Sequence, residues 1–465
     1  MADIPATPDL SGAAVLPADS APPVKAADYP PLGQAYWALF IFALSLVVNF
    51  TDRGIINLLV TPIKRDLHLS DIEMSLLMGF AFVAFYVILG LPIARLVDSK
   101  SRRAIVGFGL ACWSMMTALC GIAQNFWSLF LCRVGVGVGE ACTGPATFSM
   151  LADFFPPHRL TRAIALMSFG AIVGVGLSQM IGAGVLQVLS GVPDMHVPVL
   201  GVVHSWQLVF FIVGLPGLVV AALMLTVREP PRRGRMTKTA DPSKAVPFSA
   251  VLKFVWNNRR CYGPTFIAIA VGTIALSGAG AWTIAFYQRT YGWSPVQAGY
   301  LTGLNFLLSG PLGLFLGTWL AERYAQLGFE DANIRLARWS SLIAIPFGII
   351  GPLMPTPWLA LGMSFLSLVT GGIAGAPVSA ALQLITPNEM RGQISALYLF
   401  IVNVLGTGLG PTLTAVLTDV LFGNENDLRY SLALTAAISS PIAAGCYWLC
   451  LKHYRAAVAR SKAWR

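Results

Sequence analysis

Two acidic residues, Asp52 and Glu140, lie in the interior of apolar stretches of this 465-residue chain, and each has an arginine nearby. Arg53 follows Asp52 directly, and Arg133 precedes Glu140 by seven residues. Ionisable groups are costly at such positions, and within a membrane they mark ion, proton or substrate pathways. A carboxyl group whose surroundings alternate between water and protein can take up and release a proton. Asp52, Glu140 and Arg133 are therefore the predicted proton-coupling residues.

The two acid and arginine pairs differ in geometry. On an α-helix, residues seven apart lie within roughly 20° of the same face and about 10.5 Å apart along the axis. Arg133 and Glu140 then share one face with Gly137, and their charged groups meet only through extended side chains or a bridging water. Asp52 and Arg53 diverge by about 100°, so they serve different neighbours. A static ion-pair cluster that holds two helices together is the alternative interpretation.

The stretches around these residues have the length of membrane-spanning helices. The chain is 56% hydrophobic and 11% charged, whereas soluble domains average about 25% charged residues. Apolar stretches of roughly twenty residues, the length that crosses a bilayer, recur between short polar breaks, and in lipid they must be helices. Twelve are predicted, beginning near residues 35, 74, 104, 127, 162, 206, 261, 296, 335, 357, 392 and 428. The sequence therefore predicts an all-α membrane protein.

The net charge of +10 follows the predicted topology. Of the 31 Lys and Arg residues, four fall in alternate loops, Lys64, Arg65, Arg289 and Arg429, and two lie inside helices. The others lie in the N-terminal segment, the remaining loops and the C-terminus, which is the bias of the positive-inside rule. We therefore expect both termini in the cytoplasm and no nucleic acid partner.

A basic, proline-containing segment divides the predicted helices six against six. We expect a disordered cytoplasmic tail over 1–33, helix bundles over 34–227 and 261–453, a basic cytoplasmic linker over 228–260 and a cytoplasmic tail over 454–465. The two halves resemble each other weakly: Gly144-Pro145-Ala146 is followed about 230 residues later by Gly375-Ala376-Pro377. Two parallel six-helix repeats form the pseudo-symmetric plan of a secondary transporter.

The loop after the second predicted helix, Asp98-Ser99-Lys100-Ser101-Arg102-Arg103, resembles the cytoplasmic loop motif of the major facilitator superfamily. Ala94 and Ser101 replace its glycines, Ser99 replaces its first basic residue, and the counterpart ending in Glu322-Arg323 is weaker. The resemblance implies that this loop locks the cytoplasmic side while the outer side is open. It would place Asp98 near a helix N-terminus of the other half and Arg102 near Asp153; topology-setting charge is the alternative.

Within that superfamily, the chain resembles the bacterial members of the spinster group of lipid transporters. The resemblance rests on Asn49-Phe50-Thr51-Asp52-Arg53, Gly135-Val136-Gly137-Val138-Gly139-Glu140-Ala141, Leu151-Ala152-Asp153-Phe154-Phe155 and Arg228-Glu229-Pro230-Pro231-Arg232. It covers most of the first half and little of the second. It implies a monomer in the inner membrane whose substrate is a lysophospholipid or a sphingoid phosphate.

Several further side chains are candidates for substrate binding. Arg53 and Arg133 are predicted to face an anionic head group, because a guanidinium binds phosphate or carboxylate in a bidentate manner. Trp282, Phe286 and Tyr287 share one face of the seventh predicted helix, which could bend at Gly278 and Gly280 for gating; ordinary packing is the alternative. Polar candidates elsewhere in the apolar stretches are Gln179, Asn305, Tyr398 and Asn403.

Three classes of function remain open. The sequence favours a proton-coupled transporter of an amphipathic anionic lipid that works by alternating access. The second class is a proton-linked symporter or multidrug exporter of small organic ions. The third class is a receptor or an intramembrane enzyme. An enzyme is disfavoured because the five histidines lie in loops or at helix ends without metal-ligand spacing. The seven cysteines also lack that spacing, so we expect no cofactor.

Overall fold

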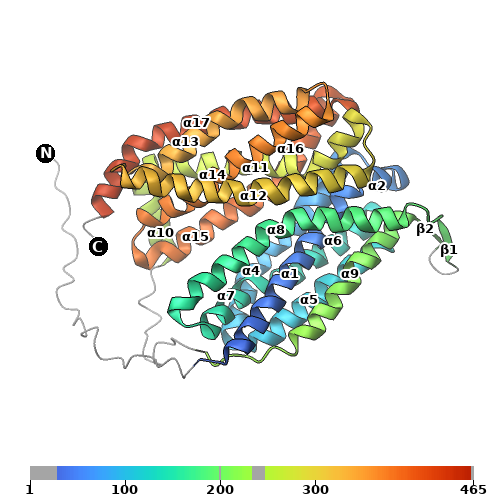
Figure 1. Ribbon diagram of the computed structural model, residues 1–465, viewed down its shortest axis with the longest axis horizontal. Helices are drawn as coiled ribbons and strands as arrows, with labels where there is room; N and C mark the ends of the chain where they lie inside the picture. The colour runs from blue at the N-terminus through green and yellow to red at the C-terminus, as the bar shows by residue number, and fades with distance from the viewer. Residues whose placement is uncertain (1–28, 198–200, 233–246, 462–465) are drawn as a thin grey trace.

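The computed structural model describes residues 29–197, 201–232 and 247–461, which form two bundles of long helices (Figure 1). The bundles meet at one end of the molecule and diverge towards the other, where the C-terminal helix ends (Figure 1). Eleven helices among the described residues are long and apolar enough to cross a membrane. The tail predicted over 1–33 lies mostly outside the described residues.

The N-terminal bundle contains the first six predicted spans. In chain order its elements are α1 (Leu32–Leu58), α2 (Val60–Leu67), α3 (Asp71–Ser75), the π-helix η2 (Leu76–Phe80), α4 (Ala81–Ser99), α5 (Arg102–Cys120), α6 (Phe126–Glu140), α7 (Thr143–Phe154), α8 (Pro157–Leu189) and α9 (Ser205–Met224). Between α8 and α9, the strands β1 (Met195–Val197) and β2 (Gly201–Val203) pair antiparallel and place His196 opposite Val202.

The C-terminal bundle contains the other six. Its elements are α10 (Phe248–Asn257), α11 (Arg259–Tyr291), α12 (Pro295–Gln326), α13 (Ala332–Ile350), η4 (Gly351–Leu353), α14 (Pro357–Leu384), η5 (Asn388–Met390), α15 (Arg391–Phe400), the π-helix η6 (Ile401–Leu409), α16 (Gly410–Val416), the π-helix η7 (Leu417–Phe422), η8 (Glu425–Asp427) and α17 (Leu428–Ser461). The predicted fold class is confirmed, and the predicted spans correspond to these elements.

The fourth predicted span is broken, whereas the sequence predicts one continuous helix. It consists of α6 and α7, separated by a turn at Ala141 and Cys142. Pro145 has no N–H to donate to the carbonyl of Ala141, so one bond of a continuous helix is missing at this point. Because the break follows Glu140 directly, the predicted face shared by Arg133 and Glu140 still applies within α6.

Other expectations about helix continuity and boundaries differ from the structure. No break interrupts the seventh span at its glycines, because α11 continues through Gly278 and Gly280, and a bend there for gating stays a prediction. Instead, Gly278 allows close packing: a Cβ there would lie 2.8 Å from the carbonyl oxygen of Gly410 on α16. The predicted linker contains a helix, α10, and α17 continues to Ser461, past the predicted boundary at residue 453.

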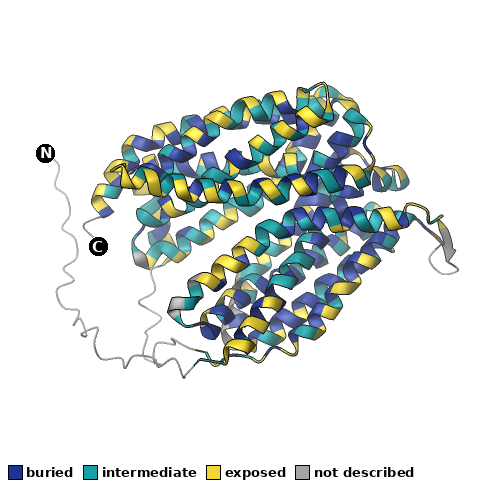
Figure 2. Ribbon diagram, viewed as in Figure 1, coloured by how far each residue is buried: buried dark blue, intermediate teal, exposed yellow. Residues whose placement is uncertain are grey.

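Small residues bring the backbones of the helices close together. A Cβ on Gly137 of α6 would overlap the carbonyl oxygen of Phe82, whereas a Cβ on Gly144 would meet nothing within 4 Å. Between the bundles, a Cβ on Gly176 of α8 would lie 2.6 Å from the carbonyl oxygen of Gly303 on α12. Buried residues line the faces between helices, and exposed residues follow the outer faces (Figure 2). Such small-residue contacts are typical of helices in lipid.

Candidate functional site

The intramembrane charges form one cluster in the N-terminal bundle. Arg53 of α1 donates from Nε to Oε2 of Glu140 over 2.6 Å, which pairs the first and fourth spans. The side chain of Glu140 is fully buried, whereas that of Arg53 remains 26% exposed. The guanidinium of Arg53 also lies 4.0 Å from the ring centre of Phe82 and 5.5 Å from that of Tyr86, in cation–π geometry. Arg53 is therefore the accessible member of this pair.

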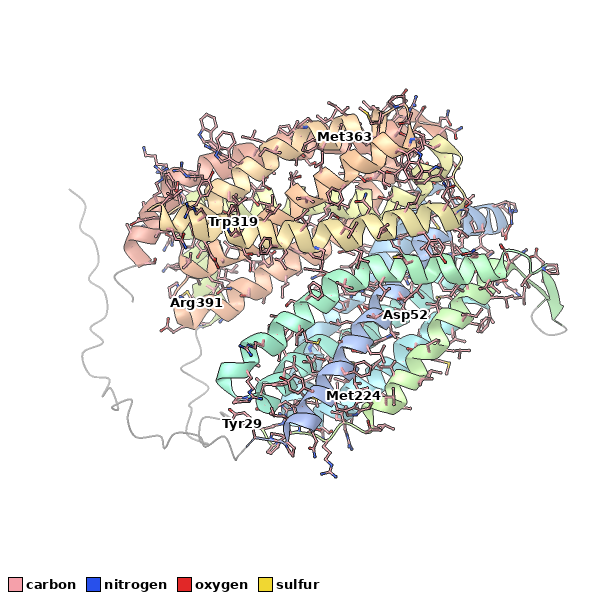
Figure 3. The ribbon with its side chains drawn as sticks, viewed as in Figure 1. Tyr29, Asp52, Met224, Trp319, Met363 and Arg391 are labelled. Atoms are coloured by element: carbon pink, nitrogen blue, oxygen red, sulfur yellow. The ribbon has the colours of Figure 1, made fainter. Side chains whose placement is uncertain are left out.

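Asp52 points into the N-terminal bundle and is fully buried (Figure 3). Neither of its carboxylate oxygens has a hydrogen-bond partner among the described residues. The side chains of Trp113 and Thr117 lie beside it, but their polar atoms are also without partners. An ionised carboxylate without donors at this depth carries a desolvation cost of several kcal/mol, which protonation removes.

Arg133 is buried and binds backbone rather than a carboxylate. Its Nη1 donates to the carbonyl oxygen of Asp52 over 3.0 Å, and its Nε donates to that of Leu77 over 3.3 Å. Arg133 therefore joins α6 to α1 and η2. The sequence places Arg133 and Glu140 on one face, but the ion pair of Glu140 is with Arg53, whose side chain reaches from α1 to the end of α6.

A cavity of about 340 Å³ lies in the C-terminal bundle. Among the described residues that line it, Gln179 of α8 is the only one from the N-terminal bundle, and none is charged. Along α11 the lining extends from Ala268 to Tyr287, which is about 28 Å of helix at 1.5 Å per residue. The wall is apolar and aromatic, with hydroxyl groups from serines and threonines distributed along it.

Some of the predicted substrate residues line this cavity, whereas others lie in the charged cluster or pack between helices. Five of them are among the residues that line the cavity: Gln179, Phe286, Tyr287, Asn305 and Tyr398. Asn305 donates from Nδ2 to Oγ of Ser364 over 2.7 Å, while its Oδ1 has no partner among the described residues. This oxygen is an available acceptor for a ligand hydroxyl or N–H group.

Besides Arg53 and Arg133, two predicted substrate residues are not among those that line the cavity. The indole Nε1 of Trp282 donates to the carbonyl oxygen of Pro411 over 3.0 Å, so this buried ring joins α11 to α16. Asn403 donates to the carbonyl oxygen of Leu399 in the preceding turn. Their roles in substrate binding stay predictions.

Comparison with known proteins places this architecture in a family. A profile of the Major Facilitator Superfamily matches residues 42–451. The chain belongs to the major facilitator superfamily. It is a multi-pass membrane transporter with a spinster-like fold, as the sequence resemblance implied.

Individual relatives agree with this assignment. An MFS-type efflux pump of Mycolicibacterium smegmatis is 30% identical over 435 residues, which cover 91% of this chain and 94% of that protein. Protein spinster homolog 1 of Xenopus tropicalis is 26% identical over 404 residues, covering 82% of this chain and 72% of that protein. The crystal structure of a bacterial homologue of the human lysosomal transporter Spinster, inward-facing and unoccupied, is similar with a TM-score of 0.77 and 26% identity. That similarity covers 94% of this chain and 99% of the other.

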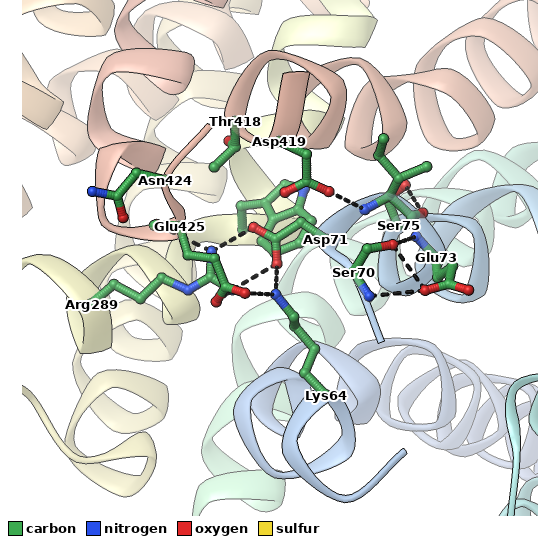
Figure 4. A network of polar contacts seen from close by, with 12 residues as sticks. Lys64, Ser70, Asp71, Glu73, Ser75, Arg289, Thr418, Asp419, Asn424 and Glu425 are labelled. Atoms are coloured by element: carbon green, nitrogen blue, oxygen red, sulfur yellow. Dashed lines mark hydrogen bonds and ion pairs between the residues drawn. The ribbon is translucent and has the colours of Figure 1, made fainter. Parts of the chain in front are cut away.

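A polar network joins the two bundles of the transporter at the end where they meet (Figure 4). Asp71 of α3 accepts from Nη1 and Nη2 of Arg289 on α11, over 2.6 and 2.8 Å, and it also pairs with Lys64 of α2. Lys64 in turn contacts Glu425 of η8 over 2.6 Å. Nearby, the backbone N–H of Ile72 donates to Asp419 over 3.0 Å. The buried carboxylate of Asp71 thus holds cations from both bundles.

The sequence does not predict this network, because Lys64 and Arg289 stand in it only as charges in alternate loops. A signal was available. The alternate loops that contain Lys64, Arg289 and Arg429 have few basic residues, and they also contain the carboxylates of Asp71 and Glu425. Opposite charges at otherwise uncharged helix ends are suited to pair with each other when the bundles come together.

At the other end, the family motif forms a network within the N-terminal bundle. Arg102 pairs with Asp153, as the resemblance implied, and donates from Nη2 to the carbonyl oxygen of Pro230 over 2.9 Å. Glu229 accepts from the backbone N–H groups of Arg102 and Arg103 over 2.8 and 3.3 Å, so its carboxylate caps the N-terminus of α5. Burial alone raises the pKa of Glu229, but hydrogen bonds from Ser101 and these N–H groups outweigh it and lower the pKa.

The other predicted gating residues are less constrained. The side chain of Asp98 lies outside the described residues, so its expected contact with the other half stays a prediction. Glu322 and Arg323 are exposed near the end of α12. Gly280 lines the cavity, and a Cβ there would meet nothing within 4 Å.

Proposed function

We propose that this protein is a proton-coupled secondary transporter of an amphipathic anionic lipid, a lysophospholipid or a sphingoid phosphate. The observation that carries the proposal is the division of chemistry between the bundles. The charged cluster around Arg53 belongs to the N-terminal bundle, and the uncharged cavity belongs almost entirely to the C-terminal bundle. A molecule with an anionic head and an apolar chain matches both surfaces.

Arg53 is the proposed head-group contact. Its side chain is partly exposed although its partner Glu140 is fully buried, so an incoming anion can reach the guanidinium. Guanidinium groups bind phosphate and carboxylate through paired hydrogen bonds. A bound phosphate would compete with Glu140 for the same donors.

Competition at Arg53 provides a coupling mechanism. When the head group takes the donors of Arg53, Glu140 becomes a buried carboxylate without its counter-ion and binds a proton. When the head group leaves, Arg53 returns to Glu140 and the proton is released. Asp52, buried without hydrogen-bond partners among the described residues, is the second proposed proton site.

The cavity is the proposed chain-binding site. It follows α11 along much of its length, and its apolar wall offers burial to an acyl or sphingoid chain at roughly 25 cal/mol per Å². Asn305 and the wall hydroxyls would hold polar groups between head and chain. Exchange between outer and inner openings would follow alternating access, with the Lys64, Asp71, Arg289 and Glu425 network closing the outer side in the conformation described.

The test compares a lysolipid with its own head group. In proteoliposomes, we expect transport of lysophosphatidylglycerol to exceed that of glycerophosphoglycerol, which lacks the acyl chain, and Arg53→Gln to abolish it. Arg65→Gln is the matched control, because Arg65 lies on α2 with an exposed side chain. Equal transport of both compounds would refute an amphipathic substrate.

A second candidate function follows from the relatives. The similarity to the Mycolicibacterium efflux pump covers nearly the whole of both chains, so export of small organic ions is compatible with this family. Transport of such ions, with no transport of the lysolipid, would favour this alternative.

The proposed orientation places both termini in the cytoplasm of a cell with this protein in its inner membrane. It rests on the concentration of Lys and Arg in the terminal segments and alternate loops. We propose that the transporter acts as a monomer, since each chain contains both the charged cluster and the cavity. Labelling of Leu32→Cys by a membrane-impermeant maleimide only after lysis would support the orientation, and labelling in intact cells would contradict it.

A further inference from the structure

The short helix α10 has three distinct sides. Its buried side packs on the C-terminal bundle through Val251, with Phe254 and Val255 partly buried beside it. Phe254 meets the ring of Tyr262 edge-on at 5.9 Å. Hydrogen bonds fix the end of the helix, since Asn258 donates to the carbonyl oxygen of Phe254 and accepts from Arg460 of α17. α10 is therefore part of the folded bundle.

The second side of α10 is apolar and exposed. Phe248, Leu252 and Trp256 follow one another at i, i+4 and i+8, so they form a single row along the helix. Their exposed fractions are 54%, 47% and 68%. Each leaves a large apolar side chain uncovered by the described residues, and a row of them on one short helix requires a partner.

The third side is polar and basic. Ser249, Lys253 and Asn257 form an exposed row next to the apolar one, and the exposed Arg259 and Arg260 follow at the start of α11. The guanidinium of Arg259 lies 5.4 Å from the ring centre of Trp256, so the basic and aromatic groups adjoin. An apolar row beside cations on one helix is the pattern of a helix that lies in a membrane interface.

The position of α10 in the fold also favours a membrane surface as its partner. α10 lies beside α15 at the end of the C-terminal bundle where α11 begins (Figure 1). α11 is long and apolar enough to cross a membrane and starts at Arg259, so Asn258 alone separates α10 from the end of that candidate span.

We propose that α10 docks on the bilayer surface, inserting Phe248, Leu252 and Trp256 among the lipid chains while Lys253, Arg259 and Arg260 bind anionic phospholipid head groups. The charges select the partner, because basic residues close to a membrane surface are attracted to its anionic lipids. This surface is separate from the charged cluster and the cavity, and the inference does not depend on the proposed function.

The test places spin labels on two sides of the same helix in the full-length protein. Leu252→Cys reports on the apolar row and Asn257→Cys on the polar row, and wild-type protein treated with the label provides the background from native cysteines. In phosphatidylcholine and phosphatidylglycerol liposomes, we expect the label at 252 to collide more with oxygen than with a water-soluble nickel chelate. The label at 257 should show the reverse. Phe248→Cys repeats the first measurement at an independent position.

Lipid charge is tested with the same labels. Adding phosphatidylglycerol to phosphatidylcholine should move the label at 252 deeper, and the triple variant Lys253→Gln, Arg259→Gln, Arg260→Gln should lose this shift. A label at 252 that collides mainly with the nickel chelate would show that α10 faces water. A label protected from both reagents would show that protein covers it. Either result, or a depth that does not depend on phosphatidylglycerol, overturns the proposal.

Discussion

Replacing Asp71 with Asn should weaken the contact that holds the two bundles together through Lys64 and Arg289. The carboxylate is fully buried and binds Arg289 from the other bundle through two hydrogen bonds, and Lys64 beside it is only 8% exposed. Removing one partner from a buried ion pair costs about 3 to 5 kcal/mol. Because Glu425 remains close to both cations, we take about 3 kcal/mol, which is on the order of 100-fold in the population of the conformation in which this network joins the bundles.

The distance between the outer ends of the bundles reports this population. Spin labels at Arg65→Cys on α2 and Asn426→Cys on η8, both exposed sites, should show a new, longer distance in the Asp71→Asn background. Glu73→Gln is the matched control, because Glu73 binds only the nearby Ser70 in the hydrogen bonds described. An unchanged distance distribution in folded Asp71→Asn protein would refute the assignment of this network as the outer closure.

Three further predictions concern stability and the cavity. The folded-state pKa of Glu229 is lowered, so its stabilising contribution is present above the unfolded pKa of about 4.3 and is lost as pH falls through the folded pKa. The melting temperature of wild type should therefore fall more steeply below about pH 5 than that of Glu229→Gln. Parallel melting curves would contradict the capping role of Glu229. Gly137→Ala should destabilise the protein by about 1 to 3 kcal/mol in thermal unfolding, because the new Cβ overlaps backbone of α4, whereas Gly144→Ala has open space and should be neutral or stabilising. Gly280→Phe should fill part of the cavity and abolish lysolipid transport in a folded protein. The control Gly445→Phe, which is also in open space but outside the cavity lining, should leave transport unchanged. Normal transport by Gly280→Phe would exclude the cavity as the binding site for the acyl chain.

The sequence predicted the spans well, because helices in lipid must be long and apolar and this chain separates them with short polar breaks. It did not predict the break after Glu140. Apolar residues continue through that segment, and hydropathy does not register the hydrogen bond that Pro145 removes. The sequence also does not predict α10 as a separate helix. The apolar spacing of Phe248, Val251, Leu252 and Val255 indicates a helix, but the basic residues and prolines around it favour a linker.

The sequence predicts which residues form the charged cluster, but it does not predict which of them form an ion pair. Depth within an apolar stretch is a property of sequence, so Asp52, Arg53, Arg133 and Glu140 could be identified directly. The Arg53 to Glu140 ion pair depends on where α1 and α6 lie relative to each other in the folded bundle, which no local pattern encodes. For the same reason, spacing along α11 could not separate Trp282, which packs on α16, from Phe286 and Tyr287, which line the cavity.

The most direct test of the central claim measures proton movement coupled to lipid. The protein is reconstituted in liposomes that contain a pH-sensitive dye, and lysophosphatidylglycerol is added to wild type, Glu140→Gln and Asp52→Asn, each first shown to be folded by thermal unfolding. We expect lipid-dependent proton flux in wild type and its loss in Glu140→Gln, with reduced flux in Asp52→Asn. Lipid-dependent proton flux that persists unchanged in both variants would contradict the proposed coupling through these carboxylates.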